Sequence, residues 1–172
     1  LIKIEDRGPV FFRQKRCTKN GKVFEILKFR SMIVDAEKGG ETIPCRTGDP
    51  RITHVGRVIR KLRIDEFPQI INVLKGDMSI VGPRPERVEH VEAYTKEIPE
   101  FSYRLRVKGG LTGYAQIYGK NNPSPYDKLR LDLQYIEKQS LLMDLKLILL
   151  TVKIMFVPES TEGFTQKRSE QI

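Results

Sequence analysis

Two adjacent carboxylates, Asp65 and Glu66, precede a turn in which Arg84 stands between two prolines, and the surrounding chain is strongly basic. This combination suits a metal-assisted reaction on a phosphate-bearing substrate, because Mg²⁺ screens a carboxylate that attacks an anionic phosphorus. Adjacent side chains point in different directions, so one carboxylate could bind the metal while the other attacks. Arg60, about one and a half helical turns before Asp65, could neutralise phosphate oxygens.

Each of these features also has a purely structural interpretation. Pro83 and Pro85 fix the backbone on both sides of Arg84, so the guanidinium would be presented with little entropy left to lose. A Gly-Pro-Arg-Pro sequence is equally typical of the entry to a helix. The two carboxylates could do no more than cap a helix N-terminus.

The elements that must hold these residues begin with a predicted hairpin. Asn20-Gly21 lies between two strand-like runs and favours the positive φ angles of a tight turn. We therefore expect a basic two-stranded hairpin within residues 1–34, which opens with a strand-like segment at residues 1–4. Lys28 and Arg30 share one face of the second strand, where they could line a phosphate site or be solvated.

The rest of the chain is predominantly helical in pattern. Residues 35–53 predict a loop, and a helical period begins at about residue 54. A second helix is expected to start at Asp65 as its N-cap, which would place the carboxylates where a phosphate also binds. Its buried stripe would comprise four apolar residues, Phe67, Ile70, Ile71 and Leu74.

The second half of the chain predicts further helices around one irregular segment. Helices are expected at residues 86–96, briefly after Pro99, and from residue 125 to about 157 as one long helix or two; residues 107–119 predict irregular structure. The fold class is therefore α+β, a helix-rich single domain with a small N-terminal hairpin. Its parts are the hairpin (1–34), a loop (35–53), a helical core (54–157) and a tail (158–172).

Composition narrows the class of partner. The formal charge is +9, and residues 1–30 hold nine basic residues against three acidic ones, which indicates an anionic partner such as nucleic acid, a phosphorylated substrate or a membrane leaflet. Two cysteines and two histidines in 172 residues disfavour a disulfide scaffold, a zinc site and a Ser-His-Asp triad. The phosphate-binding glycine motifs of ATPases and dinucleotide enzymes are missing.

Residues 141–157 form the longest apolar run, interrupted by Asp144, Lys146 and Lys153. Such a helix could pack in the core, or it could lie in a membrane interface with its lysines reaching the headgroups. The chain also begins without methionine, so we expect it to be a fragment of a longer protein.

Several ordered motifs together resemble one known family. They lie at residues 7–14, 28–32, 62–69, 72–79, 82–85, 111–116 and 142–146, and they include Asp-Glu-Phe-Pro-Gln, Gly-Pro-Arg-Pro and Leu-Thr-Gly-Tyr. The chain resembles the catalytic domain of the bacterial sugar transferases that prime cell-surface polysaccharide synthesis, the monotopic polyprenyl-phosphate phosphoglycosyl transferases. Where many members have Arg-Pro-Gly-Ile-Thr-Gly-Trp, this chain has a different sequence at residues 108–114, which could alter sugar choice or acceptor contacts.

The resemblance implies a reaction and a set of residue roles. The family transfers a sugar 1-phosphate from a UDP-sugar to undecaprenyl phosphate and releases UMP. Asp65 would be the nucleophile, Glu66 the Mg²⁺ ligand and Arg60 a phosphate ligand. Pro83, Arg84 and Pro85 would lie at the nucleotide end of the donor site, with Lys28 and Arg30 as further candidates for phosphate binding.

The resemblance also implies a location. The domain would lie on the cytoplasmic face of the inner membrane, with a re-entrant membrane helix ending just before Leu1. Membrane lipid would then be a partner, nucleic acid would not, and a homo-oligomer stays open. Two alternatives stay open as well: a non-catalytic basic module that binds nucleic acid or anionic lipid, and a nucleotide-sugar hydrolase that uses the same carboxylates to activate water.

Overall fold

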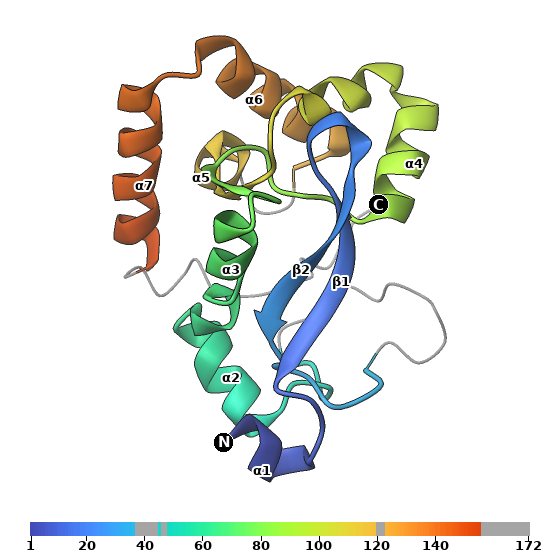
Figure 1. The fold of residues 1–172 in the computed structure, drawn as a ribbon, viewed down its shortest axis with the longest axis vertical. Coiled ribbons are helices and arrows are strands. Elements are labelled where there is room, and N and C mark those ends of the chain that lie inside the picture. Colours follow the sequence, from blue (N-terminus) through green and yellow to red (C-terminus); the bar gives the residue numbers. More distant parts are fainter. Residues whose placement is uncertain (37–44, 46–47, 120–122, 156–172) are drawn as a thin grey trace, which may run out of the picture.

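The computed structural model describes residues 1–36, 45, 48–119 and 123–155. In chain order the elements are α1 (Ile2–Asp6), β1 (Phe11–Cys17), the 3₁₀ helix η1 (Lys19–Gly21), β2 (Val23–Phe29), α2 (His54–Lys61), η2 (Ile64–Glu66), α3 (Gln69–Leu74), β3 (Ser79–Val81), α4 (Val88–Glu97), η3 (Pro99–Arg106), β4 (Gly110–Thr112), α5 (Tyr114–Tyr118), α6 (Pro125–Lys138) and α7 (Leu141–Met155). This mixture of helices and two small sheets confirms the α+β prediction (Figure 1).

The predicted hairpin forms and runs along much of the length of the molecule (Figure 1). β1 and β2 pair antiparallel from Phe11 opposite Phe29 to Cys17 opposite Val23. Their turn has φ angles of 58° at Asn20 and 73° at Gly21, as the Asn-Gly dipeptide predicts. The strand-like prediction for residues 1–4 is wrong, because the chain there forms the short helix α1.

The helix predicted from residue 54 is α2, whose N-cap Thr53 accepts a hydrogen bond from Gly56 N at 2.9 Å through its hydroxyl. Most of the loop expected at residues 35–53 lies outside the described residues. The prediction that Asp65 caps the next helix is wrong. Asp65 instead lies within the 3₁₀ turn η2, and α3 begins later, at Gln69.

The buried stripe predicted for this helix is also wrong. Leu74 is 83% exposed, and Phe67, Ile70 and Ile71 are 40–51% exposed. The buried side chains of α3 are the polar Gln69 and Asn72.

Asn72 explains why α3 buries its polar side. Its carboxamide oxygen accepts from Leu27 N at 2.9 Å, and its amide nitrogen donates to Glu25 O at 2.8 Å. These bonds satisfy backbone groups at the edge of β2, as a neighbouring strand would. They hold α3, and the η2 turn before it, against the second strand of the hairpin.

The segment predicted to be irregular, residues 107–119, contains β4 and α5. β4 pairs in parallel with β3, Ser79 opposite Gly110 and Val81 opposite Thr112. A Cβ atom on Gly110 would lie 2.1 Å from Gly82 N, so only glycine permits this approach. The pairing brings residues 82–85 beside the chain that follows η3.

Two apolar clusters hold the elements together. Phe24, Ile26 and Met78 pack between the hairpin and the end of α3. Val81, Tyr135 and Leu147 pack where β3, α6 and α7 meet. The helix expected at residues 86–96 is α4, and the long C-terminal pattern consists of two helices, α6 and α7. Within the described ranges, no helix is long and apolar enough to span a membrane.

Candidate active site

Glu66 lies at the centre of a cluster of charged side chains from three parts of the chain. Its Oε1 atom accepts from Lys28 Nζ of β2 at 2.7 Å and from Arg84 Nη2 at 2.8 Å. The two cations therefore share one carboxylate oxygen, and Oε2 lies outside both contacts. The structure thus brings together three of the residues that the sequence singled out.

The charges of this cluster set its protonation states. Burial alone would raise the pKa of Glu66, but the charges of Arg84 and Lys28 and their hydrogen bonds hold it well below its ordinary value. Burial lowers the pKa of Lys28 despite the nearby Glu66 carboxylate. Glu66 is therefore ionised at neutral pH, as a magnesium ligand must be.

Asp65 faces a different environment, because it lines a cavity of about 600 Å³ between the hairpin and η2. Burial raises the pKa of Asp65, as does the Glu66 charge, while Lys28 and Arg60 favour the ionised carboxylate. A carboxylate that is more basic than usual is, in its ionised form, a better nucleophile.

The cavity itself is rich in cations. The basic residues that line it are Arg13, Arg16, Lys28, Arg30, Arg60 and Arg87. Phe11, Phe12 and Met32 contribute an apolar wall. Its size is typical of small-molecule sites, and its charge suits a ligand with several negative charges.

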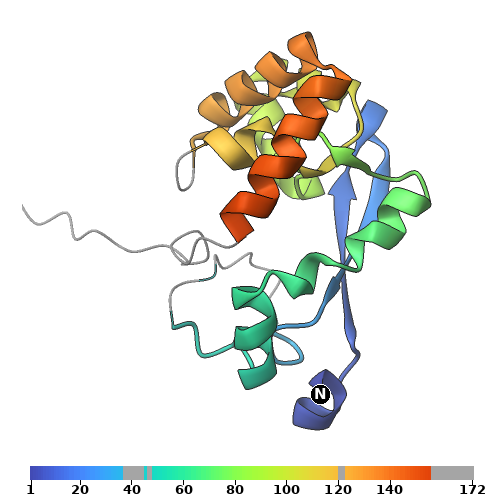
Figure 2. The ribbon, with the colours of Figure 1, turned by 90° about the vertical axis from the view of Figure 1, so that its left-hand side faces the viewer.

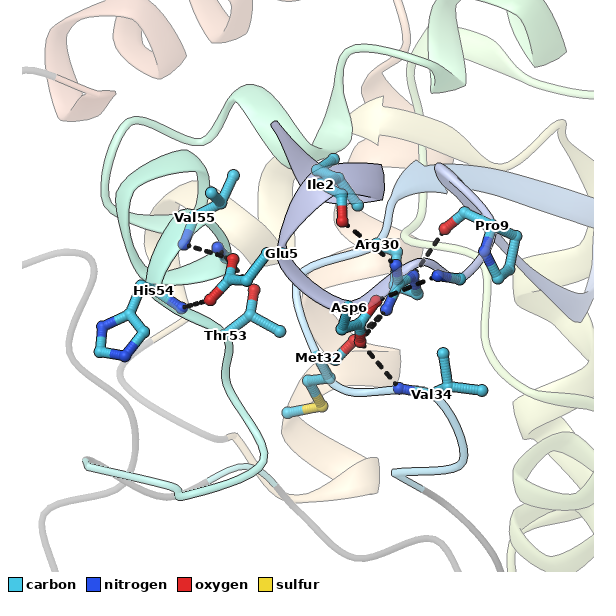
Figure 3. Close-up of polar contacts among 12 residues, drawn as sticks. Ile2, Glu5, Asp6, Pro9, Arg30, Met32, Val34, Thr53, His54 and Val55 are labelled. Carbon is cyan, nitrogen blue, oxygen red and sulfur yellow. Dashed lines mark hydrogen bonds and ion pairs between the residues drawn. The ribbon is translucent and has the colours of Figure 1, made fainter.

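Arg60 and Arg30 line the same cavity but differ in what their guanidinium groups contact. Arg60 Nη2 donates to Cys45 Sγ at 3.3 Å, a weak acceptor that an incoming phosphate could replace. Arg30 is buried and pairs with Asp6 of α1, and it also donates to the carbonyl oxygens of Pro9 and Met32 (Figure 3). Its guanidinium therefore ties the start of the chain to the cavity wall.

A second contact of α1, made by Glu5, supports the part of the cavity wall that contains Arg60. The Glu5 carboxylate accepts from the backbone nitrogens of His54 at 2.6 Å and Val55 at 3.0 Å, so α1 caps the start of α2 (Figure 3). This contact fixes the helix that carries Arg60.

Pro83 and Pro85 are buried, so their role in the structure is to shape the turn that presents Arg84. Sequence reasoning missed the groups that hold this turn. Arg104 Nη2 donates to Arg84 O at 2.9 Å, and Arg16 Nη1 donates to Pro85 O at 3.1 Å. Both donors are distant in sequence, and no motif or period links them to the turn.

The side chains present fit Mg²⁺ of the kind that binds one or two carboxylates and completes its shell with substrate phosphates and water. Asp65 and Glu66 are adjacent, and Glu66 retains an oxygen outside its contacts with Lys28 and Arg84. Among the described residues, no three His, Cys, Asp or Glu side chains cluster as a metal site, so phosphate oxygens would have to supply further ligands.

Comparison with known proteins identifies the family of the chain. Residues 1–158 match the family model described as bacterial sugar transferase. The chain belongs to the bacterial sugar transferase family.

Named relatives in this family act on undecaprenyl phosphate. The chain is 45% identical over 156 residues to the UDP-N-acetylgalactosamine-undecaprenyl-phosphate N-acetylgalactosaminephosphotransferase of Aeromonas hydrophila, a match that covers 89% of this chain and 37% of that protein. It is 41% identical over 164 residues to the UDP-glucose:undecaprenyl-phosphate glucose-1-phosphate transferase of Caulobacter vibrioides, covering 92% of this chain and 61% of that protein.

A shorter relative matches along most of its length. The uncharacterized sugar transferase EpsL of Bacillus subtilis is 41% identical over 171 residues, which are 99% of this chain and 82% of that protein. By contrast, the chain spans little more than a third of the Aeromonas relative. The sugar transferase domain is thus the part that this chain shares with all three.

Proposed function

We propose that this domain transfers a sugar 1-phosphate from a UDP-sugar to undecaprenyl phosphate and releases UMP, as the priming step of cell-surface polysaccharide synthesis. The observation that carries the proposal is Asp65, a half-buried carboxylate that opens on a cationic cavity beside the Lys28–Glu66–Arg84 cluster. The names of the relatives support the same substrates, because they include UDP-sugars and undecaprenyl phosphate.

The proposed chemistry has two displacements at one phosphorus. An Asp65 oxygen attacks the phosphorus next to the sugar, and the bond from that phosphorus to the bridging oxygen breaks, so UMP leaves with the electron pair. An oxygen of undecaprenyl phosphate then attacks the same phosphorus and the aspartyl O–P bond breaks. The products are the lipid diphosphate sugar and the regenerated carboxylate, and neither step needs a proton.

The chain's own cations assist both steps by stabilising the negative charge. Lys28 and Arg60 favour the ionised form of Asp65 and lie where they can contact phosphate oxygens in the cavity. Arg84, held by Glu66, would bind the nucleotide end of the donor. Bound Mg²⁺, held by Glu66, would supply further charge neutralisation at the phosphates.

We further propose that one side of the molecule rests on the cytoplasmic surface of the membrane. α2, α3 and α7 lie along the same side, at the left in Figure 1 and facing the viewer in Figure 2. Leu74, Leu141, Leu142 and Leu149 on these helices are each at least 70% exposed. Such apolar side chains, in a basic protein, suit an anionic lipid surface.

The covalent intermediate gives the sharpest test. Purified protein is mixed with Mg²⁺ and a panel of UDP-sugars labelled with ³²P in the sugar phosphate, without acceptor. We expect one UDP-sugar to release about one equivalent of UMP and to label the protein, and undecaprenyl phosphate to remove the label. Asp65→Asn should show neither label nor UMP. Continuous UMP release without label would instead indicate the hydrolase, and wild-type turnover by Asp65→Asn would exclude this nucleophile.

A further inference from the structure

We infer that Arg104, held by Asp132, is a positioning residue for Arg84, which it restrains through the backbone carbonyl of Arg84 itself. The inference rests on the proposed function, because Arg84 is assigned there to the nucleotide end of the donor site. It concerns two residues that touch neither Asp65 nor the cavity in the described part of the chain.

The turn from Pro83 to Glu86 is fixed by an unbroken series of hydrogen bonds to its carbonyl oxygens. The oxygen of Pro83 accepts from Gly110 N, and the oxygen of Glu86 accepts from Cys17 N, both at 2.9 Å. Between them, the oxygens of Arg84 and Pro85 accept from the guanidinium groups of Arg104 and Arg16. Four consecutive carbonyls thus have donors from β1, η3 and β4.

Arg104 is itself almost completely fixed. Its Nε and Nη2 atoms lie 2.9 and 2.7 Å from Asp132 Oδ2, and the side chains of Arg104 and Asp132 are 2% and 1% exposed. Its guanidinium also lies over the Phe101 ring, 4.9 Å from the ring centroid. A group so enclosed has few alternative rotamers, so its bond to Arg84 O has a defined direction.

Arg84 needs such support because its own side chain is poorly enclosed. It is 42% exposed, and Glu66 is its one ion-pair partner among the pairs found between described residues. The flanking prolines fix φ at residues 83 and 85, and Pro85 confines Arg84 to extended conformations, within which its ψ can still vary over about 40°. The bond from Arg104 to Arg84 O restrains the peptide plane that follows Arg84, and therefore ψ. In this way Arg104, held by Asp132, determines where the Arg84 guanidinium contacts Glu66.

The test separates positioning from stability. A buried ion pair replaced on both sides by apolar residues of similar shape usually keeps or gains stability. Arg104 Nη1 also lies 3.7 Å from Glu86 Oε1, but Glu86 keeps its 2.6 Å contact with Lys128 when Arg104 is replaced. The double variant Arg104→Met/Asp132→Leu should therefore unfold near the wild-type urea midpoint. Because the donor to Arg84 O is lost, kcat/KM for the UDP-sugar should fall about 10- to 100-fold, as when a supporting residue of a binding site is removed.

Making the same two substitutions in wild-type and in Arg84→Ala protein tests whether Arg104 acts through Arg84. In Arg84→Ala protein, the same two substitutions should change kcat/KM by less than about twofold, because no guanidinium is left to position. If the losses multiply instead, Arg104 does not act through Arg84 and the inference is overturned. The matched control is Tyr135→Phe, which removes the hydrogen bond from a buried hydroxyl of α6 to Asp144 and should keep the wild-type kcat/KM.

A readout without turnover keeps this test distinct from that of the proposed function. In ¹⁵N-labelled protein, NMR relaxation of the Arg84 Nε–H group should give a high order parameter in wild type and in Tyr135→Phe. The order parameter should be lower in Arg104→Met/Asp132→Leu. If the order parameter of Arg84 Nε–H is the same in the double variant as in wild type, the inference is overturned, even if the enzyme is active. Loss of order in the double variant, in a protein whose wild type never releases UMP, would support positioning while the proposed function fails.

Discussion

Two arginine–carboxylate pairs lie on either side of one short turn, and they differ in exposure and not in chemistry. Arg84 and Glu66 are 42% and 22% exposed, whereas Arg104 and Asp132 are 2% and 1% exposed. We call them the open pair and the sealed pair. The backbone carbonyl of Arg84 connects them, because it accepts from Arg104.

The difference shows how one interaction type serves two purposes. In the open pair, Glu66 is shared with Lys28, and solvent reaches the groups, so a substrate phosphate or a metal can enter the cluster. In the sealed pair, Arg104 contacts Asp132 and also lies 3.7 Å from Glu86 through Nη1, and solvent is excluded. The open pair is suited to binding, and the sealed pair to holding the geometry in which binding occurs.

The largest expected effect is loss of activity at the open pair. Glu66→Gln removes the carboxylate between Lys28 and Arg84 and a proposed magnesium ligand, so UMP release should fall on the order of 1,000-fold. Initial rates measured over a range of Mg²⁺ concentrations check this. A loss below about tenfold at saturating Mg²⁺ would show that the open pair is dispensable for chemistry.

The loss of folding stability should be larger at the sealed pair than at the open pair, the reverse of the expected loss of activity. Arg104→Ala leaves Asp132 buried without its cation and should lower the free energy of unfolding by about 3–5 kcal/mol. Arg84→Ala leaves Glu66 with Lys28 and solvent and should cost less than about 1 kcal/mol. Urea denaturation of both variants tests the contrast. Equal losses would mean that the two pairs do not differ as their exposure indicates.

Arg30 provides a third pair that should behave as the sealed one. Its contacts with Asp6 and two carbonyl oxygens are structural, so Arg30→Met should lower the free energy of unfolding by about 2 kcal/mol. KM for the UDP-sugar should change less than in Lys28→Met. A larger KM increase in Arg30→Met, with unchanged stability, would instead support direct phosphate binding by Arg30.

The smallest expected effect is the pH dependence of the sealed region. Burial would raise the pKa of Glu86, but Lys128 and Arg104 hold it below its ordinary value of 4.5. The folded pKa of this acid therefore lies below the unfolded one. Its stabilising contribution is present above about pH 4.5 and is lost as pH falls through the folded value.

Glu86→Gln tests this sign. Between about pH 5 and pH 3 the variant should lose less free energy of unfolding than wild type. Urea midpoints of wild type and Glu86→Gln measured across this pH range test the prediction. Parallel curves for the two proteins would show that the pKa of Glu86 does not differ between the folded and unfolded states.

The parts of the fold that were predicted correctly from the sequence are those with local causes. The hairpin follows from the backbone preference of Asn20-Gly21, and α2 follows from its period and its Thr53 cap. The parts that were wrong depend on partners elsewhere. An apolar stripe on α3 has the same pattern whether it faces the core or solvent, and only the position of Asn72 against β2 decides which.

The same distinction applies to the candidate site. Asp65, Glu66 and Arg84 belong to recognisable motifs and could be found from the sequence. Arg104 and Asp132 could not, because the pair joins η3 to α6 and nothing in their spacing encodes that contact. Lys28 and Arg30 look equivalent in the sequence, but β2 ends at Phe29, so Arg30 leaves the strand and turns toward α1.

The hydrogen bonds around the Pro83–Glu86 turn also determine the order in which an active domain can be made. Arg16 and Pro85 are 69 residues apart, and Arg104 must still meet Asp132, 28 residues farther on. During synthesis, Asp65 leaves the ribosome well before α6 exists to fix Arg104. Closing such distant contacts is slow and cooperative. A nascent chain therefore carries Asp65, the proposed nucleophile, before the contacts that position Arg84 can form.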